Sequence, residues 1–152
     1  MKTIEEEIKQ KAFPNIYVKT DVNLMFTCSW LQQLQARFFK TYGLSVQQYN
    51  VLRILRGQHP KAAMLSQITE RMIDKMSNAT RLVDKLKQKG YVTRDLNETN
   101  RRQVDIRITE KGLVLLAQID EVIANENPPE RYANVSKAEL EQFNKILNKI
   151  RN

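Results

Sequence analysis

Four side chains between positions 77 and 81 have the hydrogen-bonding groups needed to bind the edges of DNA bases. Three of them are short and polar, and the fourth is an arginine, whose guanidinium can bind the O6 and N7 acceptors of guanine together. They lie near the expected start of a helix, where free backbone amides also favour phosphate. These candidate groove-reading residues are Ser77, Asn78, Thr80 and Arg81.

Lysines continue the same segment. Lys85, Lys87 and Lys89 are expected to lie nearer the phosphate backbone, where they raise affinity without a sequence preference. Apolar residues recur on the other side at helical spacing, and Gly90 is a typical helix stop. We therefore predict an amphipathic helix over residues 76–89. Its apolar stripe consists of Ala79, Leu82, Val83 and Leu86.

A basic hairpin is expected directly after this helix. Alone, the cationic helix fits a solvated surface as well as a DNA interface. Residues 91–94 are β-prone, residues 97–100 are turn-prone, and residues 104–108 alternate between apolar and polar. The expected tip carries Arg101 and Arg102, which suit the minor groove flanking the site of the helix. The two features together favour DNA.

The segment before the cationic helix completes a helix-turn-helix. Apolar residues at positions 65, 68 and 72 predict a short helix, and Asp74-Lys75 predicts a turn. Two helices joined by a tight turn, the second with a cationic front, can place that second helix in the major groove. We therefore predict a mostly α fold with a small β-hairpin wing over residues 94–104, an α+β winged helix-turn-helix.

Further helices are expected on both sides of this unit. The first twelve residues favour a short helix that Pro14 ends, and a long helix is expected from Asp21, as N-cap, to Tyr42. Ser45 can cap the next helix, which Gly57 stops. Two helices are expected near the C-terminus, over residues 113–123 and 137–150, the first of them capped by Thr109.

The helix over residues 113–123 is apolar on nearly every side, which a compact winged helix alone cannot cover. We infer that the terminal helices pack against a second subunit, as in a symmetric homodimer. Residues 44–108 are then the DNA-binding domain. Residues 1–43 and 109–152 form the helical dimerisation region.

Composition agrees with a polyanionic partner. The 152-residue chain has a formal net charge of +8 and a pI near 9.7. Between Arg71 and Arg107 there are ten basic residues against five acidic ones. The single cysteine, Cys28, and an N-terminus without an apolar signal core favour the cytoplasm. Residues 22–36 are too polar to span a bilayer, so no membrane partner is expected.

The run from Leu44 to Leu116 resembles the MarR family of winged-helix regulators. The resemblance is carried by LSVQQYNVLRIL, ITERMIDKMSNATRLVDKLKQKGYVTR and NRRQVDIRITEKGLVLL. Within it, SNATRLVDKL resembles the recognition helix of the family and RRQVDIRITEKG its wing. The family pattern usually has an aspartate before the paired basic residues, whereas this chain has Asn100. The carboxylate that would brace the wing arginine is therefore missing, although the asparagine side chain still accepts a hydrogen bond.

The resemblance implies roles for particular residues. Arg102 becomes the minor-groove residue and Arg101 a phosphate contact, while the four residues at positions 77–81 read the major groove. It also implies a dimer on a pseudo-palindromic operator, with half-sites about 34 Å apart. Many family members release DNA when a small aromatic molecule binds. Phe26, Trp30 and Tyr49 are a candidate pocket for such an effector, although a core position is the favoured interpretation of these aromatics.

Catalytic and metal-binding motifs are missing from the sequence. There is no Gly-rich phosphate loop, G-x-S-x-G elbow or Cys-x-x-Cys pair, and His59 has no second ligand at a metal-binding spacing. We expect no enzymatic activity, no cofactor and no metal. Cys28 is interpreted as a small buried apolar residue in preference to a redox sensor, because no cation lies near it in sequence.

The expected function is sequence-specific duplex-DNA binding by a transcriptional regulator, with repression relieved by a small ligand as the favoured mode. An activator would have the same sequence features. The alternative from another class is a winged helix that docks an acidic protein partner without specific DNA binding.

Overall fold

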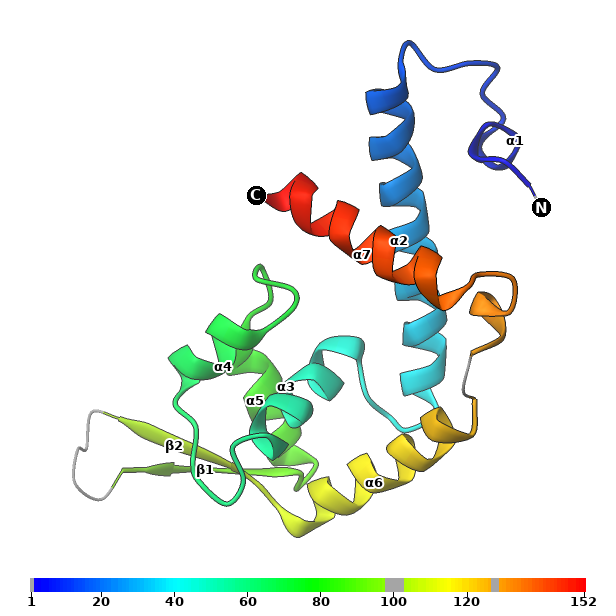
Figure 1. Cartoon of the computed structure of the whole chain (residues 1–152). Helices are drawn as coiled ribbons and strands as arrows, with labels where there is room; N and C mark the ends of the chain where they lie inside the picture. The colour runs from blue at the N-terminus through cyan, green and yellow to red at the C-terminus, as the bar shows by residue number, and fades with distance from the viewer. Residues whose placement is uncertain (1, 98–102, 127–128) are drawn as a thin grey trace. The chain divides into compact units, whose positions relative to one another are not determined.

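The computed structural model describes residues 2–97, 103–126 and 129–152. The chain divides into two compact units, residues 1–109 and residues 110–152. Its described elements are mostly helical, with one two-stranded antiparallel sheet in the first unit (Figure 1). The predicted fold class, a mostly α winged helix-turn-helix with a small β-hairpin, is therefore confirmed.

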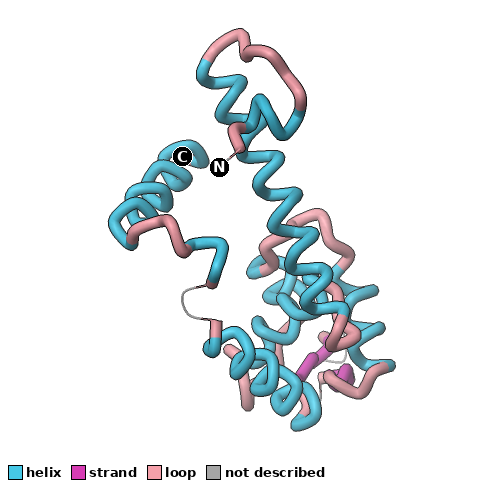
Figure 2. Tube along the Cα trace, turned by 90° about the vertical axis from the view of Figure 1, so that its right-hand side faces the viewer, coloured by secondary structure: helices cyan, strands magenta, loops and turns pink. Residues whose placement is uncertain are grey.

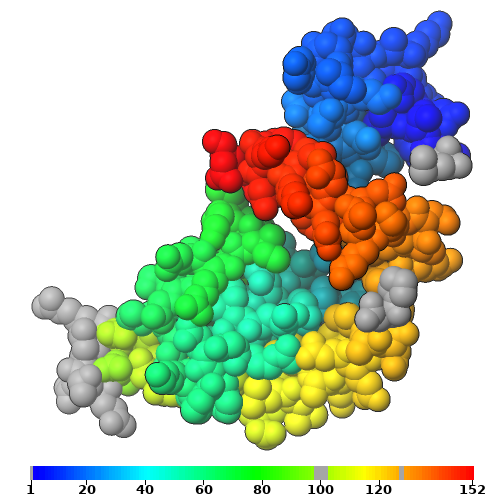
Figure 3. Space-filling model, viewed as in Figure 1, coloured from blue at the N-terminus to red at the C-terminus, as the bar shows by residue number. Residues whose placement is uncertain are grey.

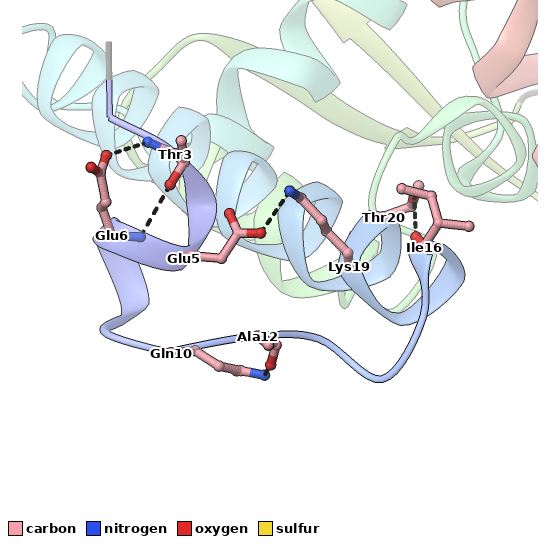
Figure 4. Close-up of polar contacts among 8 residues, drawn as sticks. All are labelled: Thr3, Glu5, Glu6, Gln10, Ala12, Ile16, Lys19 and Thr20. Carbon is pink, nitrogen blue, oxygen red and sulfur yellow. Dashed lines mark hydrogen bonds and ion pairs between the residues drawn. The ribbon is translucent and has the colours of Figure 1, made fainter.

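The first unit begins with a short helix that is held against a long one. Helix α1 (Ile4–Ile8) is closed at its start by a capping box between Thr3 and Glu6. Helix α2 spans Ile16–Lys40. The Lys19 ammonium lies 2.6 Å from the Glu5 carboxylate and so links the two helices (Figure 4).

The predicted start of the long helix at Asp21 is wrong. Asn15 is the N-cap of α2, and its side-chain oxygen accepts a hydrogen bond from the Val18 N–H at 3.0 Å. Asparagine caps as well as aspartate does, and capping at Asn15 gives the helix additional backbone hydrogen bonds. At the other end, Gly43 adopts φ 67°, as expected for the residue that closes the helix.

Three further helices build the core of the first unit. Helix α3 (Val46–Arg56) starts at Ser45 with a capping box to Gln48, as predicted for Ser45. Helices α4 (Leu65–Arg71) and α5 (Ala79–Gln88) follow, and both contact α3. The colours of Figure 3 show the coloured residues of α3, α4, α5 and the two strands gathered in one packed body. Its most completely buried side chains are Val51, Leu52, Leu55, Ile68, Met72, Val83, Leu86 and Ile106.

The predicted hairpin is confirmed. Strands β1 (Val92–Leu96) and β2 (Val104–Ile108) pair antiparallel, with Arg94 opposite Ile106. Ala63, from the segment between α3 and α4, exchanges backbone hydrogen bonds with Ile106 at 2.9 and 3.0 Å. Because Ile106 is fully buried, this contact fixes the hairpin to the core of the unit.

The second unit contains helices α6 (Glu110–Asn125) and α7 (Lys137–Arg151), with a short 3₁₀ turn at Glu130–Tyr132 (Figure 2). Both helices run slightly beyond their predicted bounds. Helix α7 starts at Ser136 with a capping box to Glu139. Helix α6 has buried residues, whereas α7 has none.

Within the parts of the chain that the structure describes, no helix combines the length and the apolar character needed to cross a membrane.

Candidate nucleic-acid interface

Helix α5 separates its apolar and cationic residues onto two faces. Ala79, Val83 and Leu86 are 6%, 1% and 0% exposed, and α5 contacts α3, α4 and strand β1. Arg81 and Lys85 are exposed on the opposite face, and Lys87 is exposed to one side of it; we call these three side chains the cationic face. Burial of the apolar back holds the helix in place, so the cationic face is presented by a rigid support.

The helix starts at Ala79, three residues later than the predicted position 76. Asn78 is the N-cap, and its Oδ1 accepts a hydrogen bond from the Arg81 N–H at 3.0 Å. The reason for the later start is a tight turn before it, in which Asp74 competes for the backbone. The Met76 N–H donates to Asp74 Oδ1 at 3.0 Å, and the Ser77 hydroxyl donates to Asp74 Oδ2 at 2.7 Å.

These contacts reduce the number of hydrogen-bonding groups that two of the groove-reading candidates have free for DNA. The hydroxyl proton of Ser77 and the Oδ1 of Asn78 are already used within the turn. The Asn78 Nδ2 group can still donate, and the Ser77 oxygen can still accept. The hydrogen bond from Ser77, followed by that from the Met76 N–H, holds the pKa of Asp74 below its ordinary value. Asp74 therefore stays ionised and keeps this turn closed.

The side chains of the cationic face differ in whether they bind other groups of the protein. Among the described residues, the side chains of Arg81 and Lys85 have no hydrogen-bond or ion-pair partner. Lys87 Nζ lies 3.4 Å from the carbonyl of Arg94. Lys89 donates to the Gly43 carbonyl and lies 3.4 Å from Gln48 Oε1, so it ties the end of α5 to the start of α3. Arg81 and Lys85 are thus available to an external anion.

An ion pair that was not predicted connects the hairpin to α5. The Arg94 Nη1 lies 2.5 Å from Asp84 Oδ1, and both side chains are partly exposed. The pair joins strand β1 to the helix beside the cationic face. The sequence shows two opposite charges ten residues apart, which alone does not predict an ion pair. The chain reverses at Gly90, with φ 76°, and this reversal brings Asp84 and Arg94 side by side.

Polar contacts hold the hairpin near the end of its strands that is closer to the tip. Asp105 Oδ1 accepts from Asn97 Nδ2 at 3.1 Å, and Asp105 Oδ2 accepts from Arg107 Nη2 at 3.0 Å. The predicted wing residues Arg101 and Arg102, and the Asn100 discussed with them, lie outside the described residues. Their roles stay predictions.

The aromatic residues of the candidate effector pocket lie in different surroundings. Tyr49 is stacked on Phe39 with ring centroids 4.0 Å apart, and its hydroxyl accepts from Arg53 Nη1 at 3.1 Å. Phe26 and Trp30 are one turn apart on α2, with exposed fractions of 38% and 44%. Phe39 lies nine residues beyond Trp30, which is about 13 Å along a helix. Tyr49 therefore lies apart from the other two in the chain as described.

A hollow of about 460 Å³ lies instead between the start of α3 and the end of α5. It is open to solvent, and lysine side chains contribute to it. Its lining consists of Ser45, Gln48, Leu82, Lys85, Gln88 and Lys89.

Cys28 departs from its predicted environment. It is exposed on α2 and was expected to be buried. A lone exposed thiol without neighbouring cations on its helix gives no basis for a redox role. No cluster of metal-ligating side chains suited to a metal ion occurs among the residues that the structure describes.

The geometry defines the class of the protein. A helix, a tight turn, a helix with a cationic face and a following β-hairpin make up a winged helix-turn-helix DNA-binding domain. Residues 44–104 match the model of the MarR family. The resemblance seen in the sequence is therefore confirmed for this segment, and the chain is similar to winged-helix transcriptional regulators of the MarR family.

Similar proteins support this assignment. The chain is 28% identical over 120 residues to the HTH-type transcriptional regulator PapX of Escherichia coli, covering 79% of this chain and 73% of PapX. Alignments with several other HTH-type transcriptional regulators span 48% to 61% of those proteins. These relatives are regulators and not enzymes, in agreement with the predicted absence of enzymatic activity.

Two solved structures show the same fold. A MarR transcription factor from Planctomyces limnophilus superposes with a TM-score of 0.68 at 28% identity, covering 90% of this chain and 98% of the other. The organohalide-sensing regulator RdhR-CbdbA1625, solved in its 2,4-dichlorophenol-bound form, gives a TM-score of 0.77 at 19% identity, covering 93% and 86%.

Proposed function

We propose that the chain is a homodimeric repressor that binds a pseudo-palindromic operator through α5 and the wing. The observation that carries the proposal is the cationic face of α5. Arg81 and Lys85 extend from a buried, rigid helix and have no partner among the described residues. Cations that the fold leaves unpaired beside a helix N-terminus are suited to a polyanion.

Roles follow from position along this face. Arg81 lies in the first turn of α5, which enters the major groove first, so it is assigned to base edges together with Asn78 and Thr80. Ser77 acts as a hydrogen-bond acceptor at the same end. Lys85 and Lys87 lie one turn or more further along and are assigned to phosphates. Arg101 and Arg102 are assigned to the backbone and the minor groove at the wing.

Exposed apolar side chains support the dimer. Phe143, Ile146 and Ile150 lie on α7 with exposed fractions of 47%, 43% and 55%. On α2, Phe39 is the buried residue, whereas Tyr17, Met25 and Trp30 are exposed. Long helices with apolar residues in water are stabilised by a second copy that covers them. The dimerisation region is therefore assigned to residues 1–43 and 109–152.

An aromatic effector fits the exposed aromatics of α2. Phe26 and Trp30 are adjacent on the helix and together present a large apolar surface. A pocket completed by the partner subunit would enclose a small aromatic molecule against these two side chains, whereas Tyr49, stacked on Phe39, lies apart from them. The solved 2,4-dichlorophenol complex of a protein of this fold is consistent with that class of ligand.

The test is selection of bound duplexes from a random library at physiological salt. Enrichment of a two-fold symmetric site with half-sites about one helical turn apart supports an operator-binding dimer. Parallel selections with Arg81→Ala and with Arg37→Ala, an exposed arginine on α2, separate the proposed contact from general charge. Featureless, salt-sensitive binding by all three proteins would contradict the proposal and favour docking of an acidic protein partner.

A further inference from the structure

Two large apolar side chains are almost fully exposed in the turn between α4 and α5. Ile73 is 87% exposed and Met76 is 94% exposed, the two highest values among the exposed large apolar residues of the described chain. The preceding residue, Met72, is only 2% exposed. The core of the unit therefore uses Met72 and leaves Ile73 and Met76 outside.

The exposure of these side chains does not come from a loose loop. The Ile73 N–H donates to Asn50 Oδ1 of α3 at 3.0 Å, and the Met76 N–H donates to Asp74 Oδ1 at 3.0 Å. Lys75 Nζ donates to the Glu70 carbonyl at the end of α4. The backbone at both apolar residues is therefore held, and a contact made by them would have little backbone entropy to lose.

The surroundings indicate the chemistry of the partner. Met76 lies two residues before the N-cap of α5, and Lys75, Asn78 and Arg81 lie close to it in the chain. Polar and cationic neighbours suit a polyanion better than an apolar protein surface or a lipid. If the polyanion is duplex DNA, the apolar group exposed in its major groove is the 5-methyl group of thymine.

We propose that Ile73 and Met76 contact thymine methyl groups within each half-site. This inference rests on the proposed function, in which α5 enters the major groove. The turn before the helix then approaches the base pairs next to those that Arg81 contacts. Methionine is suited to the task because its unbranched thioether adapts to the position of a methyl group. Asp74 and Asn50 act as positioning residues for the turn.

The experiment uses the full-length protein and a duplex obtained by selection. Each thymine of the half-site is replaced in turn by deoxyuridine, which removes the methyl group and keeps base pairing. Where Met76 or Ile73 contacts a methyl, the wild-type Kd is expected to rise about fourfold, the value for losing burial of one methyl-sized group. In Met76→Ala, the uridine-to-thymine ratio of Kd values at that position is expected to fall to about one.

A matched control is Met25→Ala, which removes another exposed methionine, on α2. Even if this change weakens the dimer and all DNA binding, the uridine-to-thymine ratio should keep its wild-type value. Circular dichroism of each variant checks that it is folded.

The outcomes separate this inference from the proposed function. A wild-type protein that binds its selected site but is indifferent to every uridine would overturn the inference and leave the function intact. The inference would also be overturned if Ile73→Ala and Met76→Ala left the uridine-to-thymine ratio of Kd values unchanged. If sedimentation then showed a smaller oligomer for these variants, the two side chains would be assigned to a contact between protein chains. If no site can be selected, both proposals fail together.

Discussion

Replacing Arg81 by alanine separates an effect on DNA binding from an effect on folding. The Arg81 side chain is exposed and has no partner among the described residues, so its removal deletes no hydrogen bond or ion pair with them. The hydrogen bond to the N-cap Asn78 comes from the Arg81 backbone N–H and persists in alanine. We expect the free energy of unfolding to change by less than about 0.5 kcal/mol.

The cost of Arg81→Ala should appear in binding to the operator. A bidentate arginine–guanine contact contributes about 1–3 kcal/mol of discrimination, which corresponds to roughly a 5- to 150-fold weaker Kd. Binding to a scrambled duplex should weaken far less, because there the side chain contacts phosphate at most. Fluorescence anisotropy on both duplexes at several salt concentrations measures the two effects, and urea unfolding measures stability.

Lys85→Ala is the matched comparison, because Lys85 is also exposed and also without a partner among the described residues. The change should weaken binding to both duplexes equally. It should also reduce the slope of log K against log salt by about 0.9, the value for one phosphate contact. Equal losses on operator and scrambled DNA for Arg81→Ala would refute its role in base recognition. A large loss of stability would refute the structural argument that its side chain is unengaged.

Three further changes test the support of the site. Leu86→Ala empties a fully buried position on the back of α5 and should lower the free energy of unfolding by about 3–5 kcal/mol in urea melts; a cost below about 1 kcal/mol would show that α5 is not packed as described. Phe143→Glu places a charge on the exposed stripe of α7, and sedimentation at micromolar concentration should show monomers; an unchanged dimer would exclude α7 from the interface. Asp74 has a pKa below its ordinary value in the folded state, so it contributes stability that is present above the unfolded-state pKa and is lost as the pH falls through the folded-state pKa. As the pH is lowered, the free energy of unfolding should therefore decrease less in Asp74→Asn than in the wild type. Identical pH profiles would contradict the role of Asp74 in the turn.

Much of the fold followed from local patterns in the sequence. The apolar stripe of α5, the alternation at Val104–Ile108 and the caps at Ser45 and Gly43 all depend on residues within a turn or two of each other. Such patterns report helices and strands directly, because burial of one face requires the matching period. The separation of cationic and apolar faces on α5 was therefore predictable from the order of its residues.

The tertiary structure decided the features that depend on competition or on distant contacts. Asn15 and Asp21 are both good N-caps, and so are Ser77 and Asn78, so the sequence alone left the starts of α2 and α5 ambiguous. Asp74 resolved the second case by binding Ser77 and the Met76 N–H. The Asp84–Arg94 ion pair and the exposure of Ile73 and Met76 arise from how helices and hairpin pack. Periodicity carries no information on such contacts, because it describes one element at a time, whereas burial and ion pairing are properties of the elements together.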